Sequence, residues 1–598
     1  MEPSVNGFGS GTRMGRGPLS AALVIATSLL ALAPGAGAAD QQTAKVEKAW
    51  DPGPLSTPYG DYLAARHAEA INDAALAAKL LERTLKHVPD DPELLRMALN
   101  QSLAAGYMDR AVDIAKRYLE KRPNSVFAKM TLAVDEIRAG RLDEAQETLK
   151  STPNRGLGGY VAPLALAWTY AGKGRSSEAL EALEPFGKRR GLTFIHDLHA
   201  AMIHDLLGET EAAEKLYDKI TSGDATHLRL IELAGAFFER HGKPDKARAI
   251  YEALLKRQSA TSTVEEALAR VGRGERPGRD INTAADGVAE AFWDLAILLN
   301  DQSAQNAALM LTRLALHARP KFELAQIMVG DILAAMNRNL DAVAAYDKVD
   351  PKTARGWEAR LRAADALTRA EQVEPALERL KGMAGERPER YDAVVSRGDI
   401  LRFRKRFEEA IDVYDEAFKR IDRIEQRHWS LHYSRGIALE RSKQWERAEA
   451  DFLAALRLLP NQPYVLNYLG YSWVDKGLNL KRALGMIETA VRLRPNDGFI
   501  VDSLGWAHYR LGNYPDAVRY LERAIVLSPS DSAINDHLGD AYWRVGRRTE
   551  ARFQWWRALK FEPEPETVPE IKKKLDSGLE DEPKKTDAYP GDRERNGG

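Results

Sequence analysis

The chain has 598 residues, which is too long for one compact core and predicts several domains or an elongated array. Its 86 Lys and Arg residues nearly balance 87 Asp and Glu residues, and the net charge of −1 gives no overall field that would attract nucleic acid or an anionic membrane. The absence of cysteine excludes disulfides, thiolate metal sites, cysteine nucleophiles and lipid attachment through an N-terminal cysteine.

The first 39 residues have the pattern of a secretory signal peptide. Arg13 and Arg16 form a basic start, residues 19–33 are uncharged and mostly apolar, and small residues at 36–39 suit cleavage before Asp40. Met14 offers a second start with a shorter signal. The alternative is an uncleaved inner-membrane anchor, although a span normally needs about 20 apolar residues. We expect an exported, periplasmic protein without a transmembrane span once the signal is removed.

After a polar lead-in at 40–58, a small residue recurs every thirty-four residues through the first array. The series is Ala77, Ala111, Ala145, Ala179, Ala213 and Ala247. Glycines accompany most of these alanines, at 106, 140, 174, 208 and 242. Small side chains allow two helices to approach closely, and glycine ends a helix in the left-handed conformation. The pattern predicts about six helix pairs over residues 59–258.

The series then breaks over residues 259–285 and resumes in a second array. TSTVEEALARV predicts one extra helix and GRGERPGRD an exposed basic loop, so we interpret this stretch as a joint. The second series predicts about eight helix pairs over 286–563 and consists of Ala308, Ala342, Ala376, Ala410, Ala448, Ala483, Ala517 and Ala551. Residues 564–579 predict a capping helix, and the composition of 580–598 predicts disorder.

The last two repeats, 498–529 and 532–563, align without a gap. Leu504-Gly505 falls on Leu538-Gly539 and Pro529 on Pro563, each pair thirty-four residues apart. This period and these residues resemble the tetratricopeptide (TPR) repeat family over about 54–563. The resemblance implies an all-α fold, an α-solenoid of stacked helix-turn-helix repeats that forms a right-handed superhelix in two arrays.

A closer resemblance covers the C-terminal third. The segments YVLNYLGYSWVDKG, GFIVDSLGWAHYRLG and INDHLGDAYWRVGR are similar to exported TPR proteins of Gram-negative bacteria. That group includes lipoprotein adaptors of periplasmic carboxyl-terminal processing proteases. It implies a periplasmic scaffold or adaptor, with such a protease or its envelope substrates as partners. Because no cysteine follows the signal, lipid anchoring does not carry over.

A first candidate site is the groove of the last three repeats. In a TPR superhelix the first helix of each pair lines the concave side, at positions spaced by three, four and three residues. These positions and their neighbours hold Tyr464, Asn467, Tyr471, Phe499, Asp502, Trp506, Tyr509, Arg510, Asp536, Asp540, Trp543 and Arg544. Rings interleaved with polar groups suit an extended peptide or a helix of a partner protein, whereas the alternative for each ring is packing between repeats.

A second candidate is an apolar surface on repeats three to five. The same stripe there holds Phe127, Met130, Val134, Ile137, Leu164, Trp168, Leu198 and Met202. Either the helices are rotated and these side chains are buried, or the array has an apolar groove for a protein partner or self-association.

No catalytic pattern is present: HExxH, GxSxG, GxxxxGK[ST] and a GxGxxG between strand and helix are all missing from the sequence. His196, His199 and His204 form the nearest approach to a metal-binding group, and a structural role is favoured for them. We expect a non-enzymatic protein without cofactor or metal. The leading hypothesis is a protein-binding adaptor, and the alternative is a polysaccharide- or peptidoglycan-associated scaffold in which groove rings stack on sugars.

Overall fold

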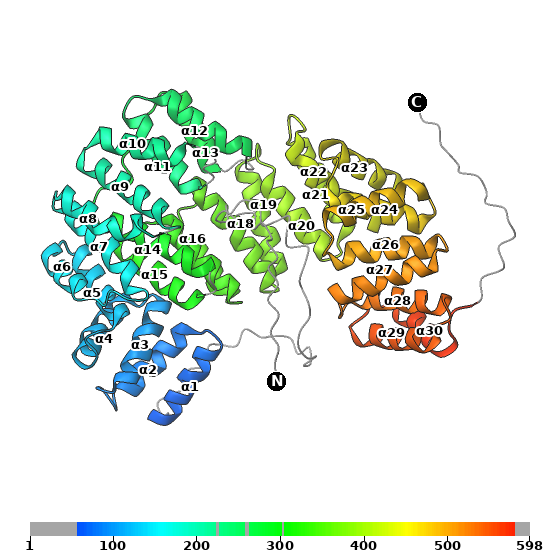
Figure 1. Ribbon diagram of the computed structural model, residues 1–598, viewed down its shortest axis with the longest axis horizontal. Helices are drawn as coiled ribbons and strands as arrows, with labels where there is room; N and C mark the ends of the chain where they lie inside the picture. Colours follow the sequence, from blue (N-terminus) through cyan, green and yellow to red (C-terminus); the bar gives the residue numbers. More distant parts are fainter. Residues whose placement is uncertain (1–56, 190, 223–226, 258–261, 302–303, 581–598) are drawn as a thin grey trace, which may run out of the picture. The chain divides into compact units, whose positions relative to one another are not determined.

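The computed structural model describes residues 57–189, 191–222, 227–257, 262–301 and 304–580 (Figure 1). The signal sequence expected at 1–39, the lead-in up to residue 56 and the tail from residue 581 lie outside the described residues. The described part of the chain forms thirty α-helices and a short 3₁₀ helix, and it contains no strand. The predicted all-α class is therefore confirmed. None of the described helices has both the length and the apolar content that crossing a bilayer requires.

The chain folds into two compact units, with the boundary after Leu380. Unit 1 begins with six helix pairs: α1 (Pro58–Ala70) and α2 (Ala74–Leu85), α3 (Pro92–Ala105) and α4 (Met108–Lys121), α5 (Val126–Arg138) and α6 (Leu142–Lys150), α7 (Gly158–Gly172) and α8 (Ser176–Gly187), α9 (Thr193–Leu207) and α10 (Thr210–Thr221), α11 (Leu228–Arg240) and α12 (Pro244–Arg257). It continues with the single helix α13 (Ser262–Gly272) and then α14 (Ala284–Asp301), α15 (Gln305–Ala318), α16 (Glu323–Ala335), α17 (Asn339–Tyr346) and α18 (Ala354–Arg369).

The boundary falls within α19 (Val373–Glu386). Unit 2 contains α20 (Asp392–Phe403), α21 (Phe407–Lys419), the 3₁₀ helix η2 (Gln426–His428), α22 (Trp429–Arg441), α23 (Trp445–Leu458), α24 (Pro463–Lys476), α25 (Leu480–Leu493), α26 (Gly498–Arg510), α27 (Tyr514–Leu527), α28 (Ser532–Arg544), α29 (Arg548–Lys560) and α30 (Val568–Ser577).

The helix ends follow from the sequence. At the start of α3, the Asp91 carboxylate accepts a hydrogen bond from the Leu94 amide at 2.8 Å, and Pro92 occupies the first helical position. Gly106 ends the helix with φ +81°, a left-handed conformation that side chains rarely adopt. The alanine of every repeat, from Ala77 to Ala551, is 0% exposed. These small side chains therefore lie where neighbouring helices approach most closely.

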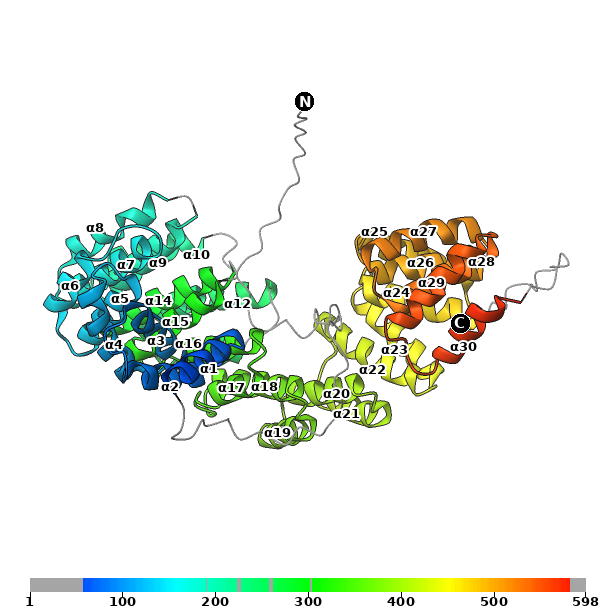
Figure 2. The same cartoon turned by 90° about the horizontal axis from the view of Figure 1, so that it is seen from below.

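The most consequential feature of unit 1 is that the solenoid curves around its own seventh helix pair. Figure 1 shows α14 and α15 inside the arc formed by the earlier repeats, where α14 packs against α5, α7 and α9, and α15 packs against α3 and α5. Figure 2 shows the same neighbourhood from below. The approach is close, because a Cβ added at Gly287 of α14 would lie 1.9 Å from the ring of Trp168 on α7.

Polar contacts join the same surfaces. The indole Nε1 of Trp168 donates to His199 Nδ1 at 3.1 Å, so the second ring nitrogen of His199 carries the proton and lies 3.2 Å from Asp294 Oδ2 of α14. On α15, His317 Nε2 lies 3.2 Å from Asp135 Oδ1 of α5. The seventh helix pair is thus bound to the earlier repeats by both packing and hydrogen bonds.

This arrangement changes the interpretation of two sequence features. The joint expected at 259–285 lies inside unit 1, and the first helices of the predicted second array belong to unit 1 as well. The reason is that α14 and α15 fill the concave side of the first repeats. The TSTVEEALARV segment does form the extra helix, as α13.

The apolar stripe of repeats three to five lies on α5, α7 and α9, the helices that α14 and α15 cover. Phe127 is half-buried, and the others are at most 3% exposed: Met130, Val134, Ile137, Leu164, Trp168, Leu198 and Met202. These side chains are buried, as the first alternative proposed, and they are buried on the helices that α14 and α15 contact. The groove is apolar, but this chain fills it, so we do not retain the stripe as a docking or self-association surface.

We predict that Gly287→Ala loosens the contact between α14 and α7, because the new methyl group would overlap the rigid indole of Trp168. Overpacking of this kind lowers the free energy of unfolding by about 1–3 kcal/mol. Urea denaturation and hydrogen exchange of α7 and α14 measure the effect. Gly272→Ala is the matched control, since no heavy atom lies within 4 Å of the added Cβ. Equal stability of the two variants would contradict the close packing.

Candidate functional site

The concave stripe of unit 2 carries the predicted groove residues on α24, α26 and α28. The capping helix α30 packs on the α28 end of the stripe, whereas no helix of the described part of unit 2 packs across α24 and α26 in the way that α14 and α15 cross unit 1. The exposed rim of the stripe includes Phe499, which is 45% exposed. The groove of unit 2 therefore remains available to another molecule.

Three aromatic rings form a continuous stack at the centre of this stripe. The ring of Trp506 lies parallel to Tyr509 at a centroid distance of 4.8 Å and to His537 at 4.1 Å. Trp506 is half-buried, and its indole Nε1 is a buried donor with no hydrogen-bond partner among the described residues. The stack joins two repeats and presents flat apolar faces beside unused hydrogen-bonding capacity.

The third ring of the stack is held by an acid. His537 Nδ1 lies 3.0 Å from both carboxylate oxygens of Asp502. Burial alone lowers the pKa of His537, but the charge of Asp502 and its hydrogen bond outweigh burial, with smaller contributions from Asp536 and Asp540. The pKa of His537 is therefore raised above its usual value, and the imidazolium form is favoured.

The stripe residues on α28 are covered by the capping helix. Lys574 of α30 lies 2.8 Å from Asp536 Oδ2 and 2.9 Å from Asp540 Oδ2, and Asp540 also accepts from Trp555 Nε1 at 2.8 Å. Burial raises the pKa of Asp540 to about 6. Trp543 packs against Gly578, which follows α30. These three predicted groove residues thus hold the cap, and they are not free groove side chains.

The remaining predicted residues lie around the stack. Arg510 Nη1 pairs with Asp475 at 3.0 Å, and Arg544 Nε donates to the Tyr509 hydroxyl at 3.3 Å. Tyr464 and Tyr471 are half-buried, and Asn467 Oδ1 is a buried acceptor with no partner among the described residues. The structure therefore brings Tyr471, Asn467 and Phe499 to the same groove as the stack, while the two arginines brace its rim.

The two ends of unit 2 approach each other at one edge. Lys405 Nζ, in the turn between α20 and α21, lies 2.7 Å from Glu564 Oε2, in the turn between α29 and α30. Both side chains are exposed, and an exposed pair of this kind contributes little to stability. Its importance is geometric, because it places the turn between α20 and α21 beside the turn between α29 and α30.

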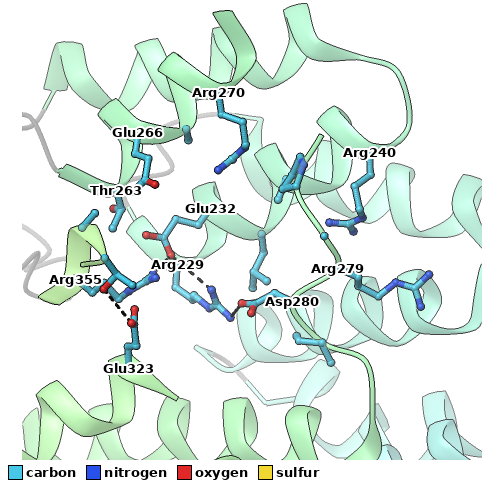
Figure 3. Close-up of a pocket in the computed structure, with 18 of the residues that line it drawn as sticks. Arg229, Glu232, Arg240, Thr263, Glu266, Arg270, Arg279, Asp280, Glu323 and Arg355 are labelled. Atoms are coloured by element: carbon cyan, nitrogen blue, oxygen red, sulfur yellow. Dashed lines mark hydrogen bonds and ion pairs between the residues drawn. The ribbon is translucent and has the colours of Figure 1, made fainter. Parts of the chain in front are cut away.

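Unit 1 contains a separate cavity of about 480 Å³, near the end of its own concave stripe (Figure 3). Arg229 and Glu232 of α11 point into it, at the stripe positions held by Ile195 and Leu198 one repeat earlier. The charged lining also includes Asp205, Arg240, Glu266, Arg270, Arg279, Asp280, Glu323, Lys352 and Arg355. The stripe changes from apolar to charged at this repeat.

Each arginine at the centre of the cavity already has a carboxylate partner. Arg229 is 6% exposed and pairs with Asp280 and with Glu290, which is 1% exposed. Arg355 pairs with Glu232, and Arg270 Nη2 lies 2.8 Å from Glu239 Oε1. The charge of Arg229 holds the pKa of the Asp280 carboxyl well below its usual range. This pairing leaves little positive charge for an anionic ligand, and it ties the 273–281 loop and α14 to α11.

The sequence stripe could have identified Arg229 and Glu232, because they lie thirty-four residues after Ile195 and Leu198. It could not have identified Asp280, which lies in the loop before α14, or Glu290, which reaches Arg229 because α14 packs inside the first repeats. The three histidines that could have formed a metal-binding group each contact a different carboxylate. His196 pairs with Asp197, His199 with Asp294, and His204 with Glu209. No group of three metal-ligating side chains converges anywhere in the described ranges.

With this geometry established, the comparisons with known proteins define the class. Residues 361–423 and 503–565 match the model of the tetratricopeptide repeat family. These two segments are therefore tetratricopeptide repeats, and the helix pairs of the described residues form an all-α TPR solenoid. Such solenoids expose extended concave surfaces that bind other proteins. The general function is that of a protein-protein interaction scaffold.

One curated relative is the TPR repeat-containing protein PA4667 of Pseudomonas aeruginosa, which is 26% identical over 164 residues. The match covers 27% of this chain and 27% of that protein, so the chain spans about a quarter of the relative's length. Among solved structures, the APC/C hetero-tetramer Cut9-Hcn1 aligns with 88% of this chain and 97% of its own, at 14% identity and a TM-score of 0.37. Yeast Tom70 aligns with 87% of this chain and 95% of its own, at 12% identity and a TM-score of 0.32.

We predict that Arg229→Met destabilises unit 1, because it leaves the buried Glu290 with only the longer contact to Arg319 Nη1 at 3.4 Å. Breaking a buried pair from one side lowers the free energy of unfolding by about 3–5 kcal/mol. Adding Glu290→Leu should restore much of the loss, since the double variant buries no unpaired charge. Arg273→Met is the control, because its exposed pair with Glu275 should change stability by less than about 1 kcal/mol. Urea denaturation of all four proteins, the natural chain and the three variants, measures these differences in the free energy of unfolding.

We also predict a pH dependence from His537. Because its pKa is raised above 6.5 in the folded state, the pair with Asp502 stabilises unit 2 fully below pH 6.5, and this contribution is lost as the pH rises through the folded pKa. Denaturation curves recorded across this range should therefore show falling stability for the natural chain. Asp502→Asn should flatten the dependence without abolishing it, because Asp536 and Asp540 remain. If stability falls with pH equally in the natural chain and in Asp502→Asn, the assignment of this pH dependence to the pair of His537 with Asp502 is refuted.

Proposed function

We propose that this protein is an exported, periplasmic scaffold that binds an extended segment of a partner protein in the groove of unit 2. The observation that carries the proposal is the open stack of Tyr509, Trp506 and His537 on the concave stripe. Aromatic rings provide large contact areas at a low cost in conformational entropy, and they dominate the binding energy of many interfaces.

The unpaired polar atoms of the groove favour a peptide as the ligand. Trp506 Nε1 is a donor and Asn467 Oδ1 is an acceptor, and both are buried without a partner in the described part of the chain. A peptide backbone supplies one donor and one acceptor per residue, so it can satisfy both atoms when side-chain movement on binding uncovers them.

The proposed location rests on the signal-like sequence of residues 1–39. The resemblance of the C-terminal third to exported TPR adaptors supports a finer proposal, in which the scaffold presents envelope proteins to a periplasmic carboxyl-terminal processing protease. Neither proposal requires catalysis by this chain.

We predict that Trp506→Ala with Tyr509→Ala abolishes capture of envelope proteins while the helical circular dichroism stays unchanged, because both residues are only half-buried. The control removes two rings elsewhere, Tyr59→Ala and Phe403→Ala, which are 83% and 56% exposed. A photo-crosslinking residue at Phe499 identifies the captured segment by mass spectrometry. Undiminished capture by the groove variant would refute the proposal.

The same experiment separates the alternative of a glycan-associated scaffold. Crosslinks to protein that persist after muramidase treatment support the peptide groove. Recovery that requires intact peptidoglycan would instead show that the stacked rings bind sugar.

A further inference from the structure

The outer face of α29 exposes two aromatic rings that the repeat does not use for packing. Phe553 is 54% exposed and Trp556 is 49% exposed, and their rings stack at a centroid distance of 6.1 Å. The neighbouring Trp555 is 0% exposed and belongs to the core. Soluble proteins seldom leave adjacent large rings in water, so this pair requires a functional explanation.

Positive side chains surround these rings. Lys560 Nζ lies 5.4 Å from the centre of the Trp556 ring, and Arg557 lies 6.0 Å from that of Phe553. In the part of the chain that the structure describes, neither cation forms an ion pair with a carboxylate, and Arg557 donates only to the Pro529 carbonyl at 2.7 Å. By contrast, Arg547 at the start of the same helix pairs with Glu522 and Glu550. The ring-bearing part of α29 is therefore uniformly positive.

The preceding repeat extends this surface. Val526 of α27, which is 79% exposed, occupies the position of Lys560 one repeat earlier, and Arg523 occupies that of Arg557. Arg523 likewise donates to a backbone carbonyl, that of Pro495, and has no carboxylate partner in the described ranges. Apolar and cationic side chains thus continue along the same outer face.

We propose that this outer face, formed by Phe553, Trp556, Arg557 and Lys560 with Val526 and Arg523, docks the protein on an anionic lipid bilayer. Tryptophan and phenylalanine rings insert at the boundary between headgroups and acyl chains, and nearby Lys and Arg side chains attract anionic headgroups. A convex face meets a flat membrane along a narrow contact, which suits a few inserting rings. Binding of this kind is reversible, and it would provide membrane attachment in a chain that has no cysteine for a lipid anchor.

Co-sedimentation with vesicles tests this proposal. The protein is residues 40–598, which include every described helix and omit the apolar N-terminal run that would itself enter lipid. Vesicles of phosphatidylcholine alone are compared with vesicles that also contain phosphatidylglycerol. We expect binding to the anionic vesicles only, and we expect it to weaken as salt is added, because the attraction is screened.

The variants separate insertion from charge. Phe553→Ser with Trp556→Ser should reduce the partition coefficient at least about tenfold, and Lys560→Glu should reduce it for anionic vesicles. Phe403→Ser is the matched control, since this ring is also exposed and lies 4.6 Å from the Arg402 guanidinium. Circular dichroism melting confirms that each variant is folded.

Three results would overturn the proposal. Equal binding of the ring variant and the Phe403→Ser control would show that the outer face does not hold lipid, as would the absence of any binding to anionic vesicles. A change of oligomeric state in Phe553→Ser with Trp556→Ser, measured by light scattering without lipid, would assign the rings to a protein interface instead. Quenching of Trp556 fluorescence by brominated lipid, absent in Trp556→Phe, would give independent support.

Discussion

Close approach of neighbouring helices at small side chains is the interaction on which every repeat depends. The alanine series from Ala77 to Ala551 is completely buried, and each alanine allows two helices to approach closely where a larger side chain would separate them. Because the same spacing recurs in each repeat, a small rotation between helix pairs is repeated and becomes curvature. In unit 1 this curvature brings α14 against α7, as the contact of Gly287 with Trp168 shows.

The two units use one backbone pattern for different purposes because their stripe residues differ. In repeats three to five the stripe is apolar, and leaving it in water would cost the free energy of hydrating several large side chains. The chain removes that cost by covering the stripe with α14 and α15. In the last repeats the stripe mixes rings with Asn467, Asp502 and His537, which can remain partly hydrated while binding a partner. Stability therefore depends on the groove of unit 1, whereas recognition is proposed for that of unit 2.

The sequence predicted what is local and periodic. The fourteen helix pairs, the extra helix α13 and the capping helix α30 follow from residues within one repeat or from its neighbour. The sequence did not predict that α14 fills the first groove, because the contact of Trp168 with Gly287 depends on rotation accumulated over several repeats. The stripe pattern also places Asp536, Asp540 and Trp543 in the groove, whereas Lys574 and Gly578 of the cap cover them, because the pattern within a repeat does not show where the helix after the last repeat packs. The stripe identifies the concave side, but a later segment decides whether it stays open.

The charge distribution leads to a related conclusion. A net charge of −1 does not describe how charge is arranged, because most described arginines near the cavity of unit 1 are neutralised by carboxylates on other helices. Arg229 illustrates the structural use of charge, since two of its partners, Asp280 and Glu290, come from the loop and from α14, and these pairs hold both segments in place. Arg523, Arg557 and Lys560 differ in that they face outward and lack a carboxylate partner in the described ranges. Paired charges in this protein therefore stabilise long-range packing, and unpaired cations beside exposed rings are the feature that distinguishes a surface available for binding.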